Sequence, residues 1–178
     1  MRYVGLVRNI MIGREGMHRV RLLERLEQLG AEDPVSFIST GNFAFDLAPE
    51  ALPELVGRFE SWLLDTLGRP ELLFVRELGE VEALVDADPF GHLPEEAIER
   101  GVSFAKTPLA IEVPWTSKRG DAVIFRVAGR EAYGHSRMVA GRTTGFGGYV
   151  ERLAGQRVTT RGFRTLERIV RKERERRG

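Results

Sequence analysis

The order in which strand-like and helix-like stretches follow one another constrains the fold of this chain most. In the first 78 residues, short apolar stretches rich in β-branched and aromatic side chains alternate with longer ones whose apolar residues recur at helical spacing. The short stretches predict strands at residues 3–12, 35–40, 43–47 and 71–78. The longer ones predict helices at residues 17–30 and about 52–67. The predicted order is therefore strand, helix, strand, strand, helix, strand.

Apolar side chains at helical spacing define the face that each of these helices is expected to bury. In the first helix they are Met17, Val20, Leu23 and Leu26, and Gly30 is expected to end the helix. In the second helix a wider apolar stripe consists of Leu52, Leu55, Val56, Phe59, Trp62, Leu63 and Leu67. Both helices are thus expected to pack on one sheet.

This order of elements is that of the ferredoxin-like fold. The rest of the chain predicts a strand at 102–112, a hairpin over 122–136 that turns at Gly129-Arg130, a short helix at 147–154, a strand at 157–161 and a final helix from 163. With 178 residues, of which 42% are apolar, both parts can bury a core. We expect an α+β protein with a ferredoxin-like half, 1–79, packed with a second, smaller α/β unit, 80–178.

Composition narrows the cellular setting and the chemistry. The chain has no cysteine, which excludes disulfides, thiolate metal ligands and a cysteine nucleophile and is typical of a reducing compartment. The apolar N-terminal run is interrupted by Arg8 and Asn9, and neither a signal-type cleavage site nor a membrane span follows it. A cytoplasmic location without membrane association is therefore predicted.

Charge is distributed unevenly along the chain. Residues 137–178 hold 12 Lys and Arg against 4 Asp and Glu, net +8, although the whole chain has a net charge of only +1. Such asymmetry favours nucleic acid or another anion as a partner. Two alternatives stay open: opposite charges dock the two parts of one fold, or the basic C-terminus is a solvated helix end.

Familiar catalytic and nucleotide-binding motifs are absent from the sequence. The stretch at 134–138 has Met138 where a nucleophile elbow needs its second glycine. The glycine-rich run at 141–148 lacks the Gly-Lys-Ser/Thr of a P-loop, and Val150 replaces the last glycine of a dinucleotide fingerprint. The three histidines have no partners at metal-ligand spacing, so we expect neither a metal nor a cofactor.

Polar residues at strand ends and helix starts remain as candidates, since free backbone N–H groups at such places can meet an anion. Arg8, Asn9 and Gly13 lead from the first strand toward the first helix. Further on, Thr143 or Thr144 is expected to cap the short helix that follows the glycine-rich run.

A third polar segment lies between the last strand and the last helix. It contains Thr159, Thr160 and Arg161, followed by Arg164. A cation in the first turn of a helix opposes the helix dipole by roughly 0.3 to 1 kcal/mol, and an anion or a carboxylate between Arg161 and Arg164 would remove that cost.

The Thr40-Gly41-Asn42 tripeptide links two predicted strands. Gly and Asn both tolerate positive φ, so Gly41-Asn42 predicts a two-residue hairpin loop. In a ferredoxin-like sheet the end of the first strand adjoins the start of the third, so we expect this turn to lie near Arg8.

Five motifs in register resemble the family known as domain of unknown function 1697: VRNIMIG, LEQLG, ISTGNFAF, DADPF and VTTRGFRTLERI. Residues that match the usual family forms are Arg8, Gly13, Gly41, Asn42, Thr159, Thr160, Arg161 and Thr165. The chain departs from those forms at Asn9, Met11, Thr40, Gly162, Phe163 and Arg164. The resemblance implies a small bacterial protein with an α+β fold in the cytosol, and it implies no reaction.

Three hypotheses about function follow. The first is a binding module for an anionic ligand, either nucleic acid or a phosphorylated small molecule, with a site formed by Arg8, Asn9, Gly13, Thr40, Gly41, Asn42, Thr159, Thr160 and Arg161. The second is an enzyme for a phosphorylated or carboxylated metabolite, without covalent nucleophile or metal, in which Arg161 clamps the substrate and Asp46 or His135 is the base. The third is a protein-interaction domain in which the same residues only hold the two halves together.

Overall fold

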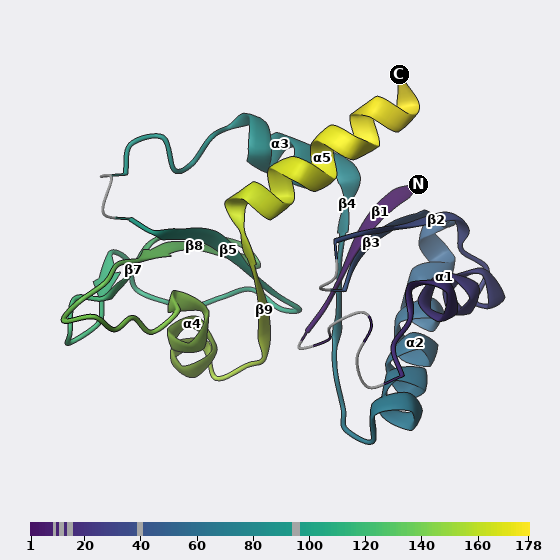
Figure 1. Cartoon of the computed structure of the whole chain (residues 1–178), viewed down its shortest axis with the longest axis horizontal. Coiled ribbons are helices and arrows are strands. Elements are labelled where there is room, and N and C mark those ends of the chain that lie inside the picture. The colour runs from purple at the N-terminus through teal and green to yellow at the C-terminus, as the bar shows by residue number, and fades with distance from the viewer. Residues whose placement is uncertain (9, 11–12, 14–15, 39–40, 94–96) are drawn as a thin grey trace. The chain divides into compact units, whose positions relative to one another are not determined.

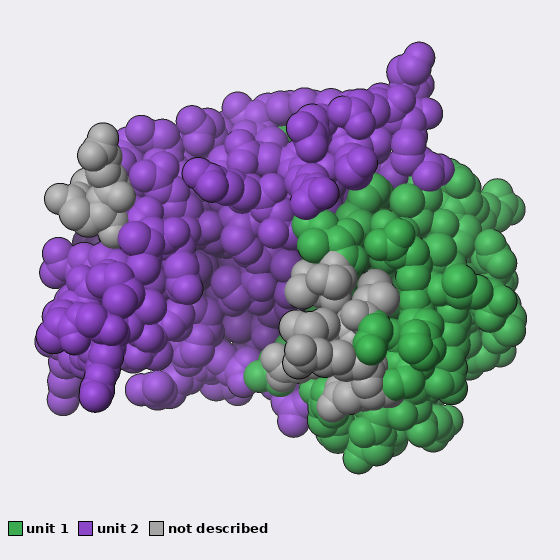
Figure 2. All heavy atoms as spheres, viewed as in Figure 1, with its two compact units in different colours: residues 1–82 green, residues 83–178 purple. Residues whose placement is uncertain are grey.

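The computed structural model describes residues 1–8, 10, 13, 16–38, 41–93 and 97–178. The chain forms two compact units, Met1–Glu82 and Ala83–Gly178 (Figure 2), and helix α3, Leu78–Asp86, contains the boundary between them. Each unit has an antiparallel sheet and helices (Figure 1), so the α+β class is confirmed. Within the described residues, no helix is long and apolar enough to cross a membrane.

Unit 1 has the predicted order of elements. They are β1 Arg2–Val7, α1 Arg19–Gln28, β2 Glu32–Phe37, β3 Asn42–Asp46, the short 3-10 helix η1 Pro49–Ala51, α2 Leu52–Leu67 and β4 Leu73–Glu77. The strands form one sheet in the order β2-β3-β1-β4, in which every pair is antiparallel. This is the ferredoxin-like arrangement, although β1 ends at Val7 and is shorter than predicted.

Helices α1 and α2 lie on the same face of this sheet (Figure 1), where phenylalanines from β3 meet the α2 stripe. The rings of Phe43 and Phe59 are 5.6 Å apart, and both side chains are fully buried. The prediction for Val20 is wrong, since this residue is 66% exposed. Helix α1 begins at Arg19 and buries Leu22 and Leu26, and two residues of helix place Val20 on the side opposite Leu22.

The connection between β2 and β3 is longer than the predicted two-residue loop. Phe37 pairs with Asn42, so residues 38–41 form the connection and Asn42 is the first residue of β3. Gly41 has φ +60°, and a Cβ added to it would lie 2.6 Å from Ile10 Cγ1. Gly41 therefore provides the turn geometry, whereas Asn42 has strand geometry.

Unit 2 is built on a second antiparallel sheet, in the order β6-β7-β8-β5-β9. Its elements are β5 Glu99–Ala105, β6 Trp115–Thr116, β7 Ala122–Ala128, β8 Glu131–Ser136, α4 Phe146–Ala154, β9 Val158–Gly162 and α5 Phe163–Arg177. Ala128 pairs with Glu131, which confirms the predicted turn at Gly129-Arg130. Strand β5 starts and ends earlier than the predicted 102–112.

Different helices cover the two faces of this sheet. On one face, the Phe146 ring of α4 lies against Gly134, where an added Cβ would come within 2.5 Å of the ring. On the other face, Phe163 of α5 packs on Phe90, with 4.9 Å between ring centroids, and Phe90 also contacts Tyr133 of β8. Strand β9 runs directly into α5, so one end of the sheet adjoins the first turn of a helix.

Candidate functional site

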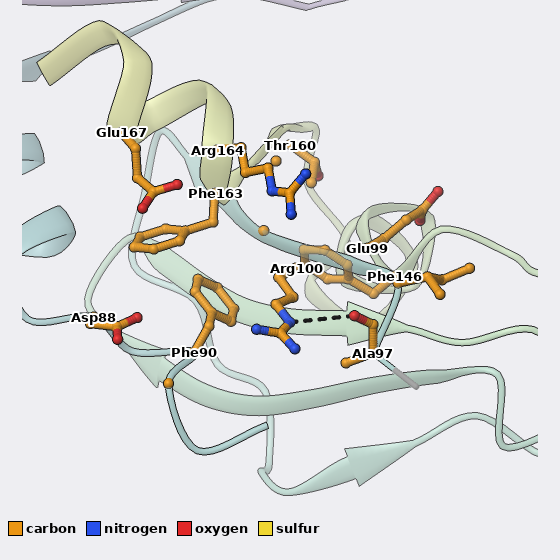
Figure 3. A pocket seen from close by; sticks show the side chains of 14 residues that line it. Asp88, Phe90, Ala97, Glu99, Arg100, Phe146, Thr160, Phe163, Arg164 and Glu167 are labelled. Atoms are coloured by element: carbon orange, nitrogen blue, oxygen red, sulfur yellow. Dashed lines mark hydrogen bonds between the residues drawn. The ribbon is translucent and has the colours of Figure 1, made fainter. Parts of the chain in front are cut away.

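A pocket of about 820 Å³ lies within unit 2, where β9 passes into α5 (Figure 3). It is lined by Asp88, Phe90, Gly91, Ala97, Ile98, Glu99, Arg100, Gly101, Phe146, Thr160, Gly162, Phe163, Arg164 and Glu167. These residues come from the segment after α3, the start of β5, the first residue of α4, the end of β9 and the first turns of α5. A pocket of this volume is large enough for a metabolite.

A pair of glycines leaves room at this end of the sheet. Gly101 of β5 is in register with Gly162 of β9, so neither strand places a side chain at this position. A Cβ on Gly101 would lie 2.6 Å from the carbonyl oxygen of Arg161. This distance is too short for any side chain, so only glycine fits at this position. Around Gly162 the nearest atom to such a Cβ is 3.9 Å away, so this side of the pair is open.

The N-terminus of α5 is part of the pocket wall. Gly162 is the N-cap residue and makes no side-chain capping hydrogen bond, and the first turn contains no acidic residue. The first N–H groups of a helix have no partner inside the helix, and the helix dipole makes this end electropositive. This end of the pocket is therefore suited to an anion.

Two arginines extend this electropositive region. The side chain of Arg164 is exposed and makes no hydrogen bond or ion pair within the described part of the chain, and in Figure 3 its guanidinium points toward Thr160 and Arg100. The Nε of Arg100 donates to the carbonyl oxygen of Ala97 at 3.3 Å. The hydroxyls of Thr160 and Ser103 are 2.7 Å apart. Arginine and threonine side chains of this kind can bind phosphate or carboxylate oxygens.

Three carboxylates also line the pocket, at Asp88, Glu99 and Glu167. All three side chains are exposed, and none makes a hydrogen bond or ion pair with another described residue. The charged lining thus has both signs, with three carboxylates against the two arginines.

Of the predicted residues of β9, only Thr160 lines the pocket. Arg161 lies next to it, and its Nη1 donates to Thr159 Oγ1 at 2.7 Å and to the carbonyl oxygen of Thr160 at 3.0 Å. Burial lowers the pKa of Arg161 to about 10. Successive residues of a strand point to opposite faces of the sheet, so Thr160 and Arg161 have different surroundings.

The predicted residues of the first half lie in unit 1. The N–H of Val7 donates to the carbonyl oxygen of Gly41 at 2.8 Å, and Asn42 pairs with Leu6, so the end of β1 does adjoin the start of β3. Asn42 is fully buried. These contacts place the Gly41 turn next to the residue that precedes Arg8.

The guanidinium of Arg8 lies 3.8 Å from the buried carboxylate of Glu71. The N–H of Gly13 donates to the carbonyl oxygen of Met17, 2.6 Å away. Asn9 and Thr40 lie outside the described residues. Since Arg8 belongs to unit 1 and Arg161 to unit 2, a site shared by the two stays a prediction.

The two predicted general bases, Asp46 and His135, do not line the pocket. Asp46 forms an ion pair with Arg2, with 3.0 Å between the charged atoms. His135 is only 9% exposed, and burial lowers its pKa, an effect that the neighbouring Arg100, Arg137 and His92 strengthen. Its Nδ1 has no hydrogen-bond partner in the described structure.

The predicted threonine cap of α4 is wrong. Gly145 is the N-cap residue, and the hydroxyl of Ser136 in β8 accepts the hydrogen bond from the Phe146 N–H at 3.1 Å. The same hydroxyl donates to the carbonyl oxygen of Thr144 at 3.4 Å. A side chain from a neighbouring strand thus caps this helix in place of Thr143 or Thr144.

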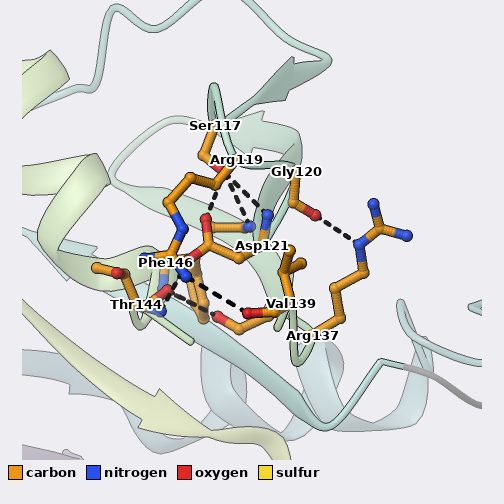
Figure 4. A network of polar contacts seen from close by, with 10 residues as sticks. Ser117, Arg119, Gly120, Asp121, Arg137, Val139, Thr144 and Phe146 are labelled. Atoms are coloured by element: carbon orange, nitrogen blue, oxygen red, sulfur yellow. Dashed lines mark hydrogen bonds and ion pairs between the residues drawn. The ribbon is translucent and has the colours of Figure 1, made fainter. Parts of the chain in front are cut away.

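Buried Asp121 holds the loop before α4 (Figure 4). The hydroxyl of Ser117 donates to Asp121 Oδ1 at 2.6 Å, and the Thr144 N–H donates to Oδ2 at 3.0 Å. Arg119 adds an ion pair at 3.9 Å. This network fixes the glycine-rich run next to β7, and its polar groups are used in the fold.

Sequence reasoning missed most of the pocket lining. Arg100 and Glu99 carry no local signal, because their role depends on the pairing of β5 with β9. Arg164 did carry one, as a cation in the first turn of a helix, and it lines the pocket. Among the described residues, no group of three or more Asp, Glu or His side chains is placed to hold a metal ion.

Comparison with known proteins gives a family and a fold. The sequence model of a family described as "Protein of unknown function (DUF1697)" matches residues 1–133. The chain is also similar in structure to the conserved bacterial protein SP0830 from Streptococcus pneumoniae, with a TM-score of 0.60 and 18% sequence identity over 96% of this chain and 97% of that one. No curated protein matches the chain. At this identity the structural likeness shows the fold alone.

Proposed function

This chain belongs to the DUF1697 family of proteins of unknown function, and we propose that it binds a small anionic ligand, phosphorylated or carboxylated, in the pocket of unit 2. One observation carries the proposal: Arg164, Arg100 and Thr160 lie together at the uncapped N-terminus of α5, around a pocket of about 820 Å³. An anion there would receive charge-assisted hydrogen bonds and would offset the repulsion between Arg164 and the helix dipole.

Binding of phosphorylated and carboxylated metabolites to the purified protein tests this proposal. Inorganic phosphate, glycerol phosphate, ribose 5-phosphate and citrate can each be titrated by isothermal calorimetry. We expect Arg164→Gln to raise the Kd of the best ligand about tenfold or more, since a hydrogen bond to a charged group is worth roughly 1.5 to 3 kcal/mol.

Arg168→Gln is the matched control for this variant. Arg168 is also an exposed arginine of α5, one turn further along the helix, and it does not line the pocket. Both variants lose the same charge from the same helix, so only a local contact accounts for a difference between them. Equal losses of affinity in the two variants, or no binding of any of these anions, would contradict the proposal.

Nucleic acid is a second candidate, favoured by the exposed cations along α5. Arg164, Arg168, Arg171 and Lys172 recur at helical spacing and are all exposed. A row of cations can contact successive phosphates of a nucleic acid backbone. Glu167 and Glu175 on the same helix reduce the charge of this row, which favours the small ligand.

An enzyme that uses the same pocket is the alternative to a binding protein. Glu99 or Glu167 would then be the general base, because these carboxylates line the pocket and Asp46 does not. Incubation of each bound metabolite with the protein, followed by ³¹P and ¹H NMR, distinguishes the two. Release of a product that depends on Glu99 or Glu167 would make the protein an enzyme.

A further inference from the structure

The charged side chains of the unit 2 pocket lie in two groups. In Figure 3, Arg164 and Arg100 lie with Glu99 on one side of the Phe163 and Phe90 rings, and Glu167 and Asp88 lie on the other side. The two rings are in contact with each other, with 4.9 Å between centroids. One group thus has two arginines against one carboxylate, whereas the other has two carboxylates and no cation among the described lining residues.

Neither of these carboxylates is neutralised inside the described structure. The side chains of Asp88 and Glu167 are exposed and make no ion pair or hydrogen bond with another described residue, and the same is true of the Arg164 side chain. Glu167 and Arg164 are three residues apart on one helix, a spacing at which two side chains can form a salt bridge. Instead, Figure 3 shows the two side chains pointing apart.

Such a lining disfavours a ligand that is only negative. A polyanion bound near Arg164 would be repelled by the nearby carboxylates, and like charges that face each other across a binding site reduce affinity. A ligand with a cationic group at its other end would instead gain an attraction at Glu167 and Asp88.

From this uneven distribution of charge we infer that the pocket takes a zwitterionic ligand, with a phosphate or carboxylate at Arg164 and a primary ammonium group at Glu167 and Asp88. The inference rests on the proposed function, because it assumes that the anionic end is bound as described there. It names the ligand class as an amine joined to an anion by a short chain, such as an amino phosphate or an amino acid derivative.

Matched pairs of probes test the cationic end separately from the anionic end. 2-Aminoethyl, 4-aminobutyl and 6-aminohexyl phosphate are each compared with the ethyl, butyl or hexyl phosphate of equal length, and Kd is measured by NMR titration of the ¹⁵N-labelled protein. At one length at least, we expect the amine to bind about threefold tighter or better, a modest factor since exposed ion pairs are weak. The best length then reports the spacing between the two ends of the site.

Variants locate the effect in the pocket. Glu167→Gln and Asp88→Asn should each reduce the advantage of the amine and leave the affinity for the alkyl phosphate the same or higher. Glu175→Gln is the control, since Glu175 is an exposed glutamate of α5 that pairs with Arg171 at 3.8 Å and does not line the pocket. The ¹⁵N spectrum of each variant shows in the same experiment that it is folded.

The outcomes separate this inference from the proposed function. Equal affinity for amine and alkyl phosphates at every length, or an advantage that persists in both pocket variants, would overturn the zwitterion and leave the anion site standing. If neither kind of probe binds, the anion site itself fails. An advantage lost only in the pocket variants supports both.

Discussion

At the scale of single residues, neighbouring side chains in β9 and α5 have different tasks. Thr160 lines the pocket, whereas Arg161 donates hydrogen bonds to Thr159 and Thr160 of its own strand. Three residues later, the Arg164 side chain has no partner in the described structure and lies in the pocket. Two arginines with the same apparent signal in the sequence thus differ because one belongs to a strand and the other to a helix turn.

Gly162 allows a sharp test of the anion site. Its backbone has φ −60° and ψ 142°, which any residue can adopt, and a Cβ would have open space around it. We expect Gly162→Asp to cap α5 and raise the free energy of unfolding by a few tenths of a kcal/mol, while its carboxylate occupies the place of the anion. Phosphate binding should then disappear although the melting temperature rises.

Gly162→Asn is the matched control, because an asparagine caps a helix as well as an aspartate and carries no charge. It should raise stability similarly and retain more of the phosphate affinity than Gly162→Asp. Calorimetric titration and thermal unfolding of both variants measure these effects. Unchanged phosphate affinity in Gly162→Asp would argue against an anion at this helix end.

At the scale of elements, the loop before α4 depends on one buried carboxylate. The hydrogen bond from Ser117 is the main cause that lowers the pKa of Asp121, against the opposing effect of burial, and the Thr144 N–H and Arg119 lower the pKa further. A carboxyl whose pKa is lower in the folded state stabilises the fold above its unfolded pKa of about 3.9. That contribution is lost as the pH falls through the lower, folded value.

We therefore expect Asp121→Asn to unfold at a lower urea concentration than the wild type at pH 7. The difference should narrow as the pH falls below about 3.9, because the Asp121 carboxyl of the unfolded wild type then binds a proton while that of the folded protein is still ionised. Hydrogen exchange of the Thr144 amide should accelerate in the variant, because this N–H donates to Asp121. Asp65→Asn, at an exposed position of α2, should change neither quantity. A constant difference between wild type and Asp121→Asn from pH 7 to pH 3 would contradict this role.

At the scale of the whole molecule, the net charge of +8 in residues 137–178 is distributed over several elements. Part of it is used inside the fold: Arg174 forms a paired contact with Asp86 at 2.7 Å and 3.0 Å, and Arg161 binds within β9. The pocket adds its own carboxylates beside the basic helix. The basic C-terminal third is thus a weaker indication of nucleic-acid binding than its net charge alone suggests.

We expect labelled single-stranded and double-stranded nucleic acid to bind only at low salt, if a small anion is the true ligand. Four phosphate contacts would cost roughly 100-fold in affinity between 50 and 200 mM salt. Fluorescence anisotropy at these two concentrations measures the effect. Binding that persists at 200 mM and is reduced by a combined Arg168→Gln, Arg171→Gln and Lys172→Gln variant would instead favour the nucleic-acid candidate.

The order of helices and strands can be derived from the sequence alone. Helical spacing of apolar residues in α2, the glycine after α1 and the Gly129-Arg130 turn act over a few residues, so periodicity and turn chemistry identify them. The ferredoxin-like arrangement of unit 1 followed from that order. One error arose because a neighbouring element decides the outcome: Ser136 of β8 caps α4. The other arose because the residue at which α1 begins leaves Val20 on the face away from the core.

The position of the pocket and the charges that line it depend on how distant segments of the chain pack together. Arg100 and Arg164 are far apart in the sequence and come together because β5 pairs with β9 and β9 continues into α5. The pairing register places Gly101 opposite Gly162, and no local pattern encodes that register. Secondary structure depends on contacts between close neighbours in the chain, whereas a binding site depends on contacts between distant ones, and the sequence specifies these only through the packing of the whole unit.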